Sequence, residues 1–368
     1  MRKVAYQNRN ILKTYMQIFQ PTLTKMQTSW ESLRKTNVEL QQFPTNIQDI
    51  LIGNFHQLVQ WYNLFMNWSL SIREKLNSSL ETLFNYDDWS QEIAEFFKDP
   101  QNGFSISSCH YCDMAYINVF EIDPDADAIY FLNTASDEEL KAKLKVKSDN
   151  TIEKIKQARI FHSKNDFKAL KTRFAPDKYE KTFKPNYKYR HHFDLDHVLP
   201  KSNCRLVSLS LFNFVPSCQI CNQKLKKTKV LGDLSGAPCE KLSPTSPNFD
   251  FDSNAEFHII TKQGTNPGRI RPVLHPQDFE LKILCKDPDY ENFVKLFKLK
   301  ERYQSHIKIA LHWMEMKIDY TDAHIQMMAN SLQHFGYSFE KIKCDIFQKD
   351  LYDNGEMSFT KLRNDMLK

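Results

Sequence analysis

Two pairs of cysteines could bind a metal ion through their thiolates. Cys109 and Cys112 form one CxxC pair, Cys218 and Cys221 form a second, and 105 residues separate the pairs. Two thiolates from each of two tight turns can make a tetrahedral four-sulfur site, for which zinc is the natural metal. The alternative is four buried free cysteines, which requires two coincidental CxxC spacings. We expect a structural zinc ion, because four protein ligands leave no open position for catalysis.

A second group of reactive residues lies just before the second pair, in residues 194–200 (DLDHVLP). Hydrolysis of a phosphodiester needs a base that is deprotonated near neutral pH, and the ordinary histidine pKa of about 6.5 suits that task. It also needs a hard cation, held by oxygen ligands, to neutralise charge on the phosphate. Asp196 and Asn222 supply such oxygens, and His197 supplies the base. Asp194 is a weaker candidate for the same cation.

Strand geometry limits how these side chains can cooperate. Neighbours in a strand point to opposite faces, so Asp196 and His197 approach one water molecule only where the strand ends or bulges. Pro200 predicts such an end. His191 and His192 form a pair beside the motif that could ligate a metal, but strand or surface positions are the favoured interpretation.

These residues resemble a known nuclease family. The stretches FDLDHVLPKSN and LSLFNFVPSCQICNQKLKKTK are similar to HNH (His-Me finger) endonucleases that carry zinc-binding CxxC pairs on either side of the motif. CHYCDMAYI resembles the first zinc half in that family, and the likeness covers residues 104–230. It implies a β-hairpin followed by a helix, the ββα-metal fold, with zinc pinning the hairpin's surroundings to the helix.

The resemblance also implies roles for individual residues. Asp196 and Asn222 would hold one divalent cation, Mg²⁺ or Mn²⁺, and His197 would be the general base. Asn213, the middle letter of the motif, would stabilise the hairpin loop and orient that base. Asn222 stands where the three-letter motif has a histidine, a variant that the family accepts, so the departure leaves the metal preference open. The expected activity is hydrolysis of DNA phosphodiester bonds without much sequence specificity.

Lysines that follow the motif are candidates for contact with nucleic acid. Lys224, Lys226, Lys227 and Lys229 lie on the same predicted helix or just beyond it, where their cations can meet DNA phosphates. About two of the four are expected to touch DNA while the others are solvated. Lys224 and Lys227 are the candidates.

A separate positive segment lies between the two cysteine pairs. Residues 141–190 contain sixteen Lys and Arg against five Asp and Glu, a local charge of +11 in a chain whose net charge is +5. Residues 132–174 are similar to a helix-hairpin-helix DNA-binding element, although KVKSD stands where its glycines are usual. Such hairpins bind phosphate through backbone amides at a helix N-terminus. Lys145 and Lys147 are candidate DNA contacts; the alternative is a lysine-rich helical insertion that packs on the nuclease core.

Hydrophobic spacing predicts the elements that position these groups. We expect a mostly helical α+β protein: a helical N-terminal region at 1–100, a zinc-braced ββα-metal HNH core at 101–230, and a C-terminal region at 231–368. The core contains the lysine-rich insertion at 131–190, where Ser136 and Glu139 predict a capping box. AEFHIITK and FELKILC are predicted strands of the C-terminal region, which then becomes helical. Residues 191–197 alternate as in one short strand.

Composition excludes several other classes of protein. The first residues lack an unbroken apolar stretch typical of a signal peptide, and no apolar run approaches the roughly 18 residues needed to span a bilayer. We therefore expect a cytoplasmic protein with no membrane partner. In that reducing compartment the cysteine pairs favour metal over disulfides.

Two other functions compete with a DNA endonuclease. A catalytically silent zinc module that only binds nucleic acid is one, but it has no need for a base beside oxygen ligands. RNA cleavage is the other, because RNA and DNA present the same phosphate. The layout, with LKERYQSHIK in its helical tail, is similar to bacterial anti-phage nucleases of Septu-type and retron-associated systems. This resemblance implies a partner that is an ABC-type ATPase or another defence-system protein. Residues 1–98 show no catalytic constellation, and the sequence leaves oligomeric state open.

Overall fold

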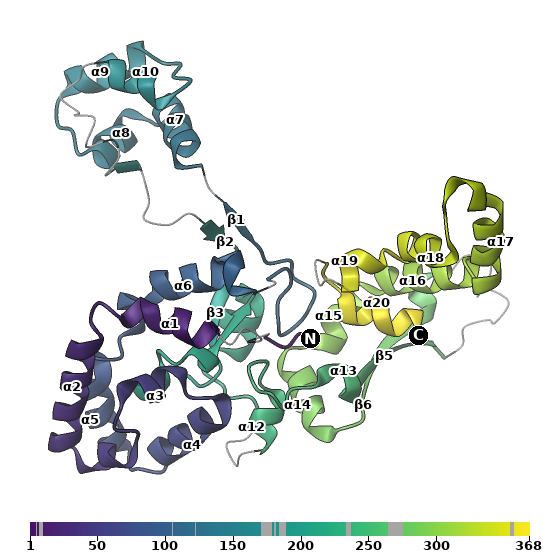
Figure 1. Cartoon of the computed structure of the whole chain (residues 1–368), viewed down its shortest axis with the longest axis horizontal. Coiled ribbons are helices and arrows are strands. Elements are labelled where there is room, and N and C mark those ends of the chain that lie inside the picture. Colours follow the sequence, from purple (N-terminus) through teal and green to yellow (C-terminus); the bar gives the residue numbers. More distant parts are fainter. Residues whose placement is uncertain are drawn as a thin grey trace. The chain divides into compact units, whose positions relative to one another are not determined.

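The computed structural model places the chain in two compact units. The residues it describes are 1–4, 6, 10–104, 106–121, 123–170, 179, 182–183, 189–232, 237–263, 275–353 and 357–368. Unit 1 combines Met1–Asn118 with His192–Lys368, and unit 2 is Val119–His191. Helices dominate both units, and the described strands pair into two-stranded antiparallel sheets (Figure 1). The fold is therefore α+β and mostly helical, as predicted.

Helices form the N-terminal part of unit 1. They are α1 (Ile11–Phe19), α2 (Leu23–Thr36), α3 (Ile47–Ile52), α4 (Phe55–Met66), α5 (Leu70–Glu81) and α6 (Ser90–Lys98). Tyr15, Phe55 and Phe65, whose helical spacing predicts a core, are fully buried. Burying a large apolar side chain stabilises the fold by about 1.5–3 kcal/mol. These aromatics are therefore core residues.

The motif residues lie on a β-hairpin followed by a helix. Strand β3 (Asp194–His197) pairs antiparallel with β4 (Phe214–Ser217), with Asp194 opposite Ser217 and His197 opposite Phe214. The helix η6 (Ile220–Lys226) begins three residues after β4 and has π-type hydrogen bonds, such as that from the Lys227 N–H to the Asn222 carbonyl. The second cysteine pair therefore lies at the junction of strand and helix.

The N-terminal helices hold the connection between β3 and β4. The hydroxyls of Ser208 and Ser210 donate to the carbonyls of Phe84 and Ile50, and the buried Tyr15 hydroxyl donates to the Leu209 carbonyl at 2.7 Å. These hydrogen bonds satisfy polar groups that would otherwise be buried without partners. The N-terminal region is thus packed against the segment that carries the hairpin loop.

A second sheet and further helices make up the C-terminal part of unit 1. Strands β5 (Ala255–Thr261) and β6 (Phe279–Cys285) pair antiparallel and confirm the two strands predicted there. The described helices are α12 (Ala237–Leu242), α13 (Phe251–Asn254), α14 (Pro288–Leu296), α15 (Leu299–Gln304), α16 (Ile307–Asp319), α17 (Asp322–Leu332), α18 (Phe339–Phe347), α19 (Lys349–Asp353) and α20 (Thr360–Leu367). Among the described residues, no helix is long and apolar enough to cross a membrane.

Unit 2 has a core of its own. Strands β1 (Val119–Glu121) and β2 (Tyr189–His191) pair antiparallel. The helices that the structure describes after β1 are α7 (Pro124–Thr134), α8 (Asp137–Leu144), α9 (Asp149–Gln157) and α10 (Lys164–Ala169). Leu132, Leu140 and Ile155 are buried in its core. The capping box of Ser136 and Glu139 is present at α8, as predicted. Unit 2 therefore contains the lysine-rich insertion and has its own hydrophobic core.

The prediction of one strand across residues 191–197 is wrong. Strand β2 ends at His191 and belongs to unit 2, whereas β3 begins at Asp194 in unit 1. The His192 N–H donates to the Asn118 carbonyl at 3.0 Å, and Phe193 is buried. Apolar and polar residues alternate through this boundary, so the sequence pattern alone does not show where one strand ends and the next begins.

We predict that Asn77→Ala loosens the connection between β3 and β4. The Asn77 side chain donates to the Asn203 carbonyl at 3.0 Å and accepts from the Arg205 N–H at 2.9 Å. Alanine leaves both backbone groups without these partners, so the free energy of unfolding should fall by about 1–3 kcal/mol in urea titrations. Ser78→Ala, at an exposed position of the same helix, is the control; an equal loss in both variants would contradict the role of Asn77.

Candidate metal centre and motif residues

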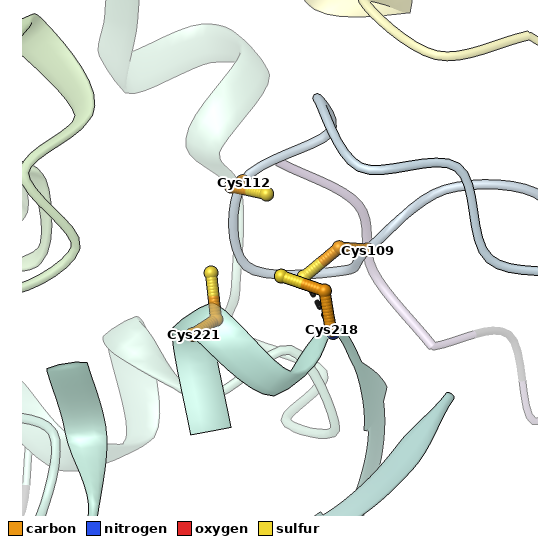
Figure 2. A group of neighbouring side chains, drawn as sticks. All are labelled: Cys109, Cys112, Cys218 and Cys221. Carbon is orange, nitrogen blue, oxygen red and sulfur yellow. Dashed lines mark hydrogen bonds between the residues drawn. The ribbon is translucent and has the colours of Figure 1, made fainter. Parts of the chain in front are cut away.

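The four cysteines of the two pairs come together in unit 1. Cys109 and Cys112 lie on a tight turn closed by hydrogen bonds from the Cys109 N–H to Ala115 and from the Asp113 N–H to Cys109, at 2.9 and 2.8 Å. Cys218 directly follows β4 and Cys221 lies within η6. All four side chains are buried, and their sulfurs lie within 4.8 Å of one another (Figure 2).

The arrangement and chemistry of these sulfurs fit a zinc ion. A tetrahedral site with Zn–S bonds of about 2.3 Å sets the sulfurs about 3.8 Å apart, so the observed cluster needs only a small contraction. The hydrogen bond with Cys109 is the main cause that lowers the pKa of Cys112 and brings the pKa of Cys218 to about 7. Burial raises the pKa of Cys109. Because zinc displaces thiol protons when it binds, the cluster can bind a metal such as zinc.

Two N–H groups donate hydrogen bonds to sulfurs of the cluster. The Cys218 N–H donates to the Cys109 sulfur, and the Arg302 guanidinium of α15 donates to the Cys221 sulfur, each at 3.3 Å. Four thiolates around Zn²⁺ carry an excess negative charge, which a positive donor in contact with a sulfur offsets. Arg302 therefore complements the charge of a metal-loaded cluster.

The turn that carries the first cysteine pair also joins distant parts of the chain. The Arg2 N–H donates to the His110 carbonyl, and the His110 N–H donates to the Pro216 carbonyl of β4. The Tyr303 hydroxyl donates to the Cys112 carbonyl at 2.7 Å, and the Asp113 carboxylate accepts from the Lys361 N–H at 3.0 Å. Residues from both ends of the chain are thus fixed to this turn.

Asp196 is buried and its carboxylate is fully engaged. The Tyr111 hydroxyl donates to Oδ2 at 2.6 Å, and the Lys226 ammonium lies 3.2 Å from Oδ1 and 3.0 Å from Oδ2. The same ammonium donates to the His197 carbonyl at 2.7 Å. Burial raises the pKa of the Asp196 carboxyl above its usual value, while Lys226 and Tyr111 oppose that rise. This carboxylate contributes to an ion pair between β3 and η6.

His197 is half-buried at the end of β3 and contacts different groups from those around Asp196. Its Nε2 lies 2.9 Å from the Ser208 carbonyl, and its ring packs on those of Tyr86 and Phe214. A carbonyl only accepts, so Nε2 carries the proton and Nδ1 has the free lone pair. Burial lowers the pKa of His197 to about 3, so the imidazole is neutral near pH 7. Nδ1 has no hydrogen-bond partner among the described residues.

Asn213 holds the two ends of the hairpin connection together. Its side-chain oxygen accepts from the Leu199 N–H at 2.8 Å, and its Nδ2 donates to the carbonyls of Leu199 and Val207 at 3.0 Å. Val207 directly precedes Ser208, whose carbonyl accepts from His197. These three hydrogen bonds, all buried, therefore fix the backbone that orients the imidazole.

Asn222 contacts Asp194 rather than Asp196. The Nδ2 of Asn222 and the Nε2 of Gln223 donate to Oδ2 of Asp194 at 3.1 and 2.9 Å. Asp194 and Asn222 are half-buried, unlike Asp196. The oxygen ligands that the sequence assigns to one cation are thus in two separate contacts: Asp196 with Lys226, and Asn222 with Asp194.

The predicted DNA-binding lysines differ in exposure. Lys224 and Lys227 are exposed on or just after η6, and Lys145 and Lys147 are exposed between α8 and α9 of unit 2. Lys226 is fully buried and so is not available to a phosphate. Sequence reasoning did not identify the residues that contact the motif side chains, namely Tyr86, Tyr111, Ser208, Lys226 and Arg302. The position of Lys226, four residues after Asn222, is a sequence signal that both side chains lie on the same side of the helix as β3.

Comparisons with known proteins add no family to this description. No protein-family model, no curated protein and no solved structure matches the chain.

We predict that Cys221→Ala abolishes metal binding and destabilises unit 1. Purified wild-type protein should contain about one zinc ion per chain by elemental analysis, since a four-thiolate site binds zinc tightly. Cys221→Ala should fall to background and unfold at a lower temperature. Cys285→Ala, half-buried on β6, should keep its metal. Normal stability in Cys221→Ala would argue against a structural metal.

A second prediction concerns the asparagine of the hairpin connection. Asn213→Ala removes three buried hydrogen bonds and leaves buried backbone groups unpaired, which should lower the free energy of unfolding by at least about 2 kcal/mol. Metal content should be retained, because none of these contacts involves the cysteines. A stability loss under about 0.5 kcal/mol in urea unfolding would show that water replaces the side chain without penalty.

Proposed function

We propose that this chain is a nuclease of the HNH type that hydrolyses phosphodiester bonds, with His197 as the general base. The observation that carries the proposal is the hydrogen bond from Nε2 of His197 to the Ser208 carbonyl at 2.9 Å. That bond leaves the Nδ1 lone pair available to accept a proton from water. Its setting, a hairpin followed by a helix beside a four-cysteine cluster, agrees with what the sequence resemblance implies.

The surroundings of His197 suit a base that works on an anion. The low pKa of about 3, caused by burial, keeps the imidazole neutral but makes it a weak base. A phosphodiester bound nearby adds negative charge, which raises an imidazole pKa towards the range for efficient proton transfer. Tyr86 and Phe214 restrict the ring to one orientation. The base is thus held ready and strengthens when substrate binds.

The residues assigned to a divalent cation do not fit one as they are arranged. Mg²⁺ and Mn²⁺ need free oxygen ligands, whereas both oxygens of Asp196 contact the Lys226 ammonium. We therefore assign no step of the reaction to a metal. The four-cysteine cluster has a structural role in the proposal, since four protein ligands close the coordination sphere of zinc.

DNA is the proposed substrate. The exposed Lys224 lies on the helix that also contacts β3, and the exposed Lys227 directly follows that helix. The exposed Lys145 and Lys147 lie between two helices of unit 2. Lysines at such positions attract phosphates regardless of base sequence. RNA carries the same phosphate, so the two polymers are compared directly in the test below.

A zinc module that binds nucleic acid without cutting it is the second candidate function. The ion pair between Asp196 and Lys226 favours it, because a carboxylate that is neutralised within the protein cannot serve a cation. The two candidates agree on binding and differ on cleavage.

We predict that the zinc-loaded protein nicks plasmid DNA and that His197→Ala reduces the rate by about 10²–10⁴-fold, the usual contribution of a general base. Zinc content and melting temperature should stay close to wild type. His192→Ala is the matched control, an exposed histidine five residues away, and should cut normally. Retention of activity in His197→Ala would reject the base. Binding of DNA and RNA with cleavage of neither by wild type would favour the silent module.

A further inference from the structure

The carboxylate of Asp196 is already in contact with a cation that belongs to this chain. The Lys226 ammonium lies 3.0 and 3.2 Å from its two oxygens and donates to the His197 carbonyl at 2.7 Å. The side chain of Lys226 is 0% exposed and that of Asp196 is 3% exposed. Together with the Tyr111 hydroxyl, these contacts surround the carboxylate.

The spacing of β3 and η6 explains why lysine reaches this position. Asp194 and Asp196 lie on one face of the strand and are about 6.6 Å apart, at about 3.3 Å per residue. Asn222 and Lys226 are four residues apart on η6, close to one turn of this helix, so their side chains leave it on the same side. Asp194 therefore meets Asn222 and Gln223, and Asp196 meets Lys226.

Because both side chains are buried, removal of either charge alone is unfavourable. A charge without a partner in a site closed to water is strongly disfavoured, so neither side chain can leave while the other stays ionised. A divalent ion that approached Asp196 would also meet the ammonium at close range, where two positive charges repel strongly in a buried site. The two cations are mutually exclusive at this carboxylate.

We infer that Lys226 is the resident cation of Asp196 and that it excludes a divalent ion from this carboxylate. The pair fixes β3 to η6 and leaves Asp196 unavailable as a ligand for a second cation. This inference refines the proposed nuclease site, but it concerns ion binding alone and is tested without any measurement of cleavage.

The test measures binding of Mn²⁺ to the zinc-loaded full-length protein by the loss of the free-ion electron paramagnetic resonance signal. Lys226→Met keeps the length of the side chain and removes its charge. We expect this variant to bind Mn²⁺ at least 10-fold more tightly than wild type. The gain should vanish in Lys226→Met combined with Asp196→Asn, which removes both charges with little change in volume.

Lys229→Met is the matched control, because it removes an equal charge at an exposed position three residues further on. It should bind Mn²⁺ as wild type does. Equal affinity in wild type and Lys226→Met would overturn the inference. A gain that persists in the double variant, or that Lys229→Met reproduces, would also overturn it, since the effect would then not involve Asp196.

Thermal unfolding covers the case in which Lys226→Met folds poorly. If a divalent ion can replace the ammonium, Mn²⁺ should raise the melting temperature of Lys226→Met and leave that of the double variant unchanged. Failure of Mn²⁺ to restore Lys226→Met, while the double variant folds, would show that Asp196 has no capacity for a divalent ion. The exclusion of a divalent ion by Lys226 would then be rejected in favour of a purely structural ion pair, whatever the outcome of the cleavage experiment.

Discussion

The convergence of four thiols is the constraint on which the rest of unit 1 depends. Cysteines separated by 105 residues share one buried cluster, and the turn that carries the first pair also contacts the N-terminal residues, β4 and α20. A metal that binds all four sulfurs closes a long loop, and its binding free energy becomes folding free energy. The hairpin with His197 is therefore positioned mainly by groups far from it in sequence.

The hairpin and the helix η6 are joined at both ends of the helix by contacts of different character, and between these ends by Asn222 and Gln223, which donate to Asp194. At one, Cys218 and Cys221 attach the start of the helix to the cysteine cluster. At the other, Lys226 attaches its end to Asp196 through a fully buried ion pair. Buried ion pairs add little net stability but impose one geometry strictly. We regard the cysteines as the source of stability and the ion pair as the source of register between β3 and η6.

Local patterns predicted the elements well, whereas contacts between elements were beyond reach. The alternation in residues 255–261 and 279–285 predicted β5 and β6, and Ser136 with Glu139 predicted the start of α8, because each pattern is contained within one element. The cysteine cluster was predictable because CxxC spacing has a chemical meaning. The partner of Asp196 was not, since it depends on how η6 lies across β3. Likewise, nothing in the local pattern separates β2 from β3 at a boundary between units.

The chain leaves unit 1 and re-enters it at neighbouring residues. Unit 2 is inserted between Asn118 and His192, and these two residues are joined by a backbone hydrogen bond of 3.0 Å. An insertion whose ends are adjacent places no mechanical demand on its host, so it tolerates replacement, lengthening or excision. We therefore expect unit 1 to fold without unit 2. Sequence changes can therefore accumulate in unit 2 without disturbing the cysteines or the imidazole of unit 1.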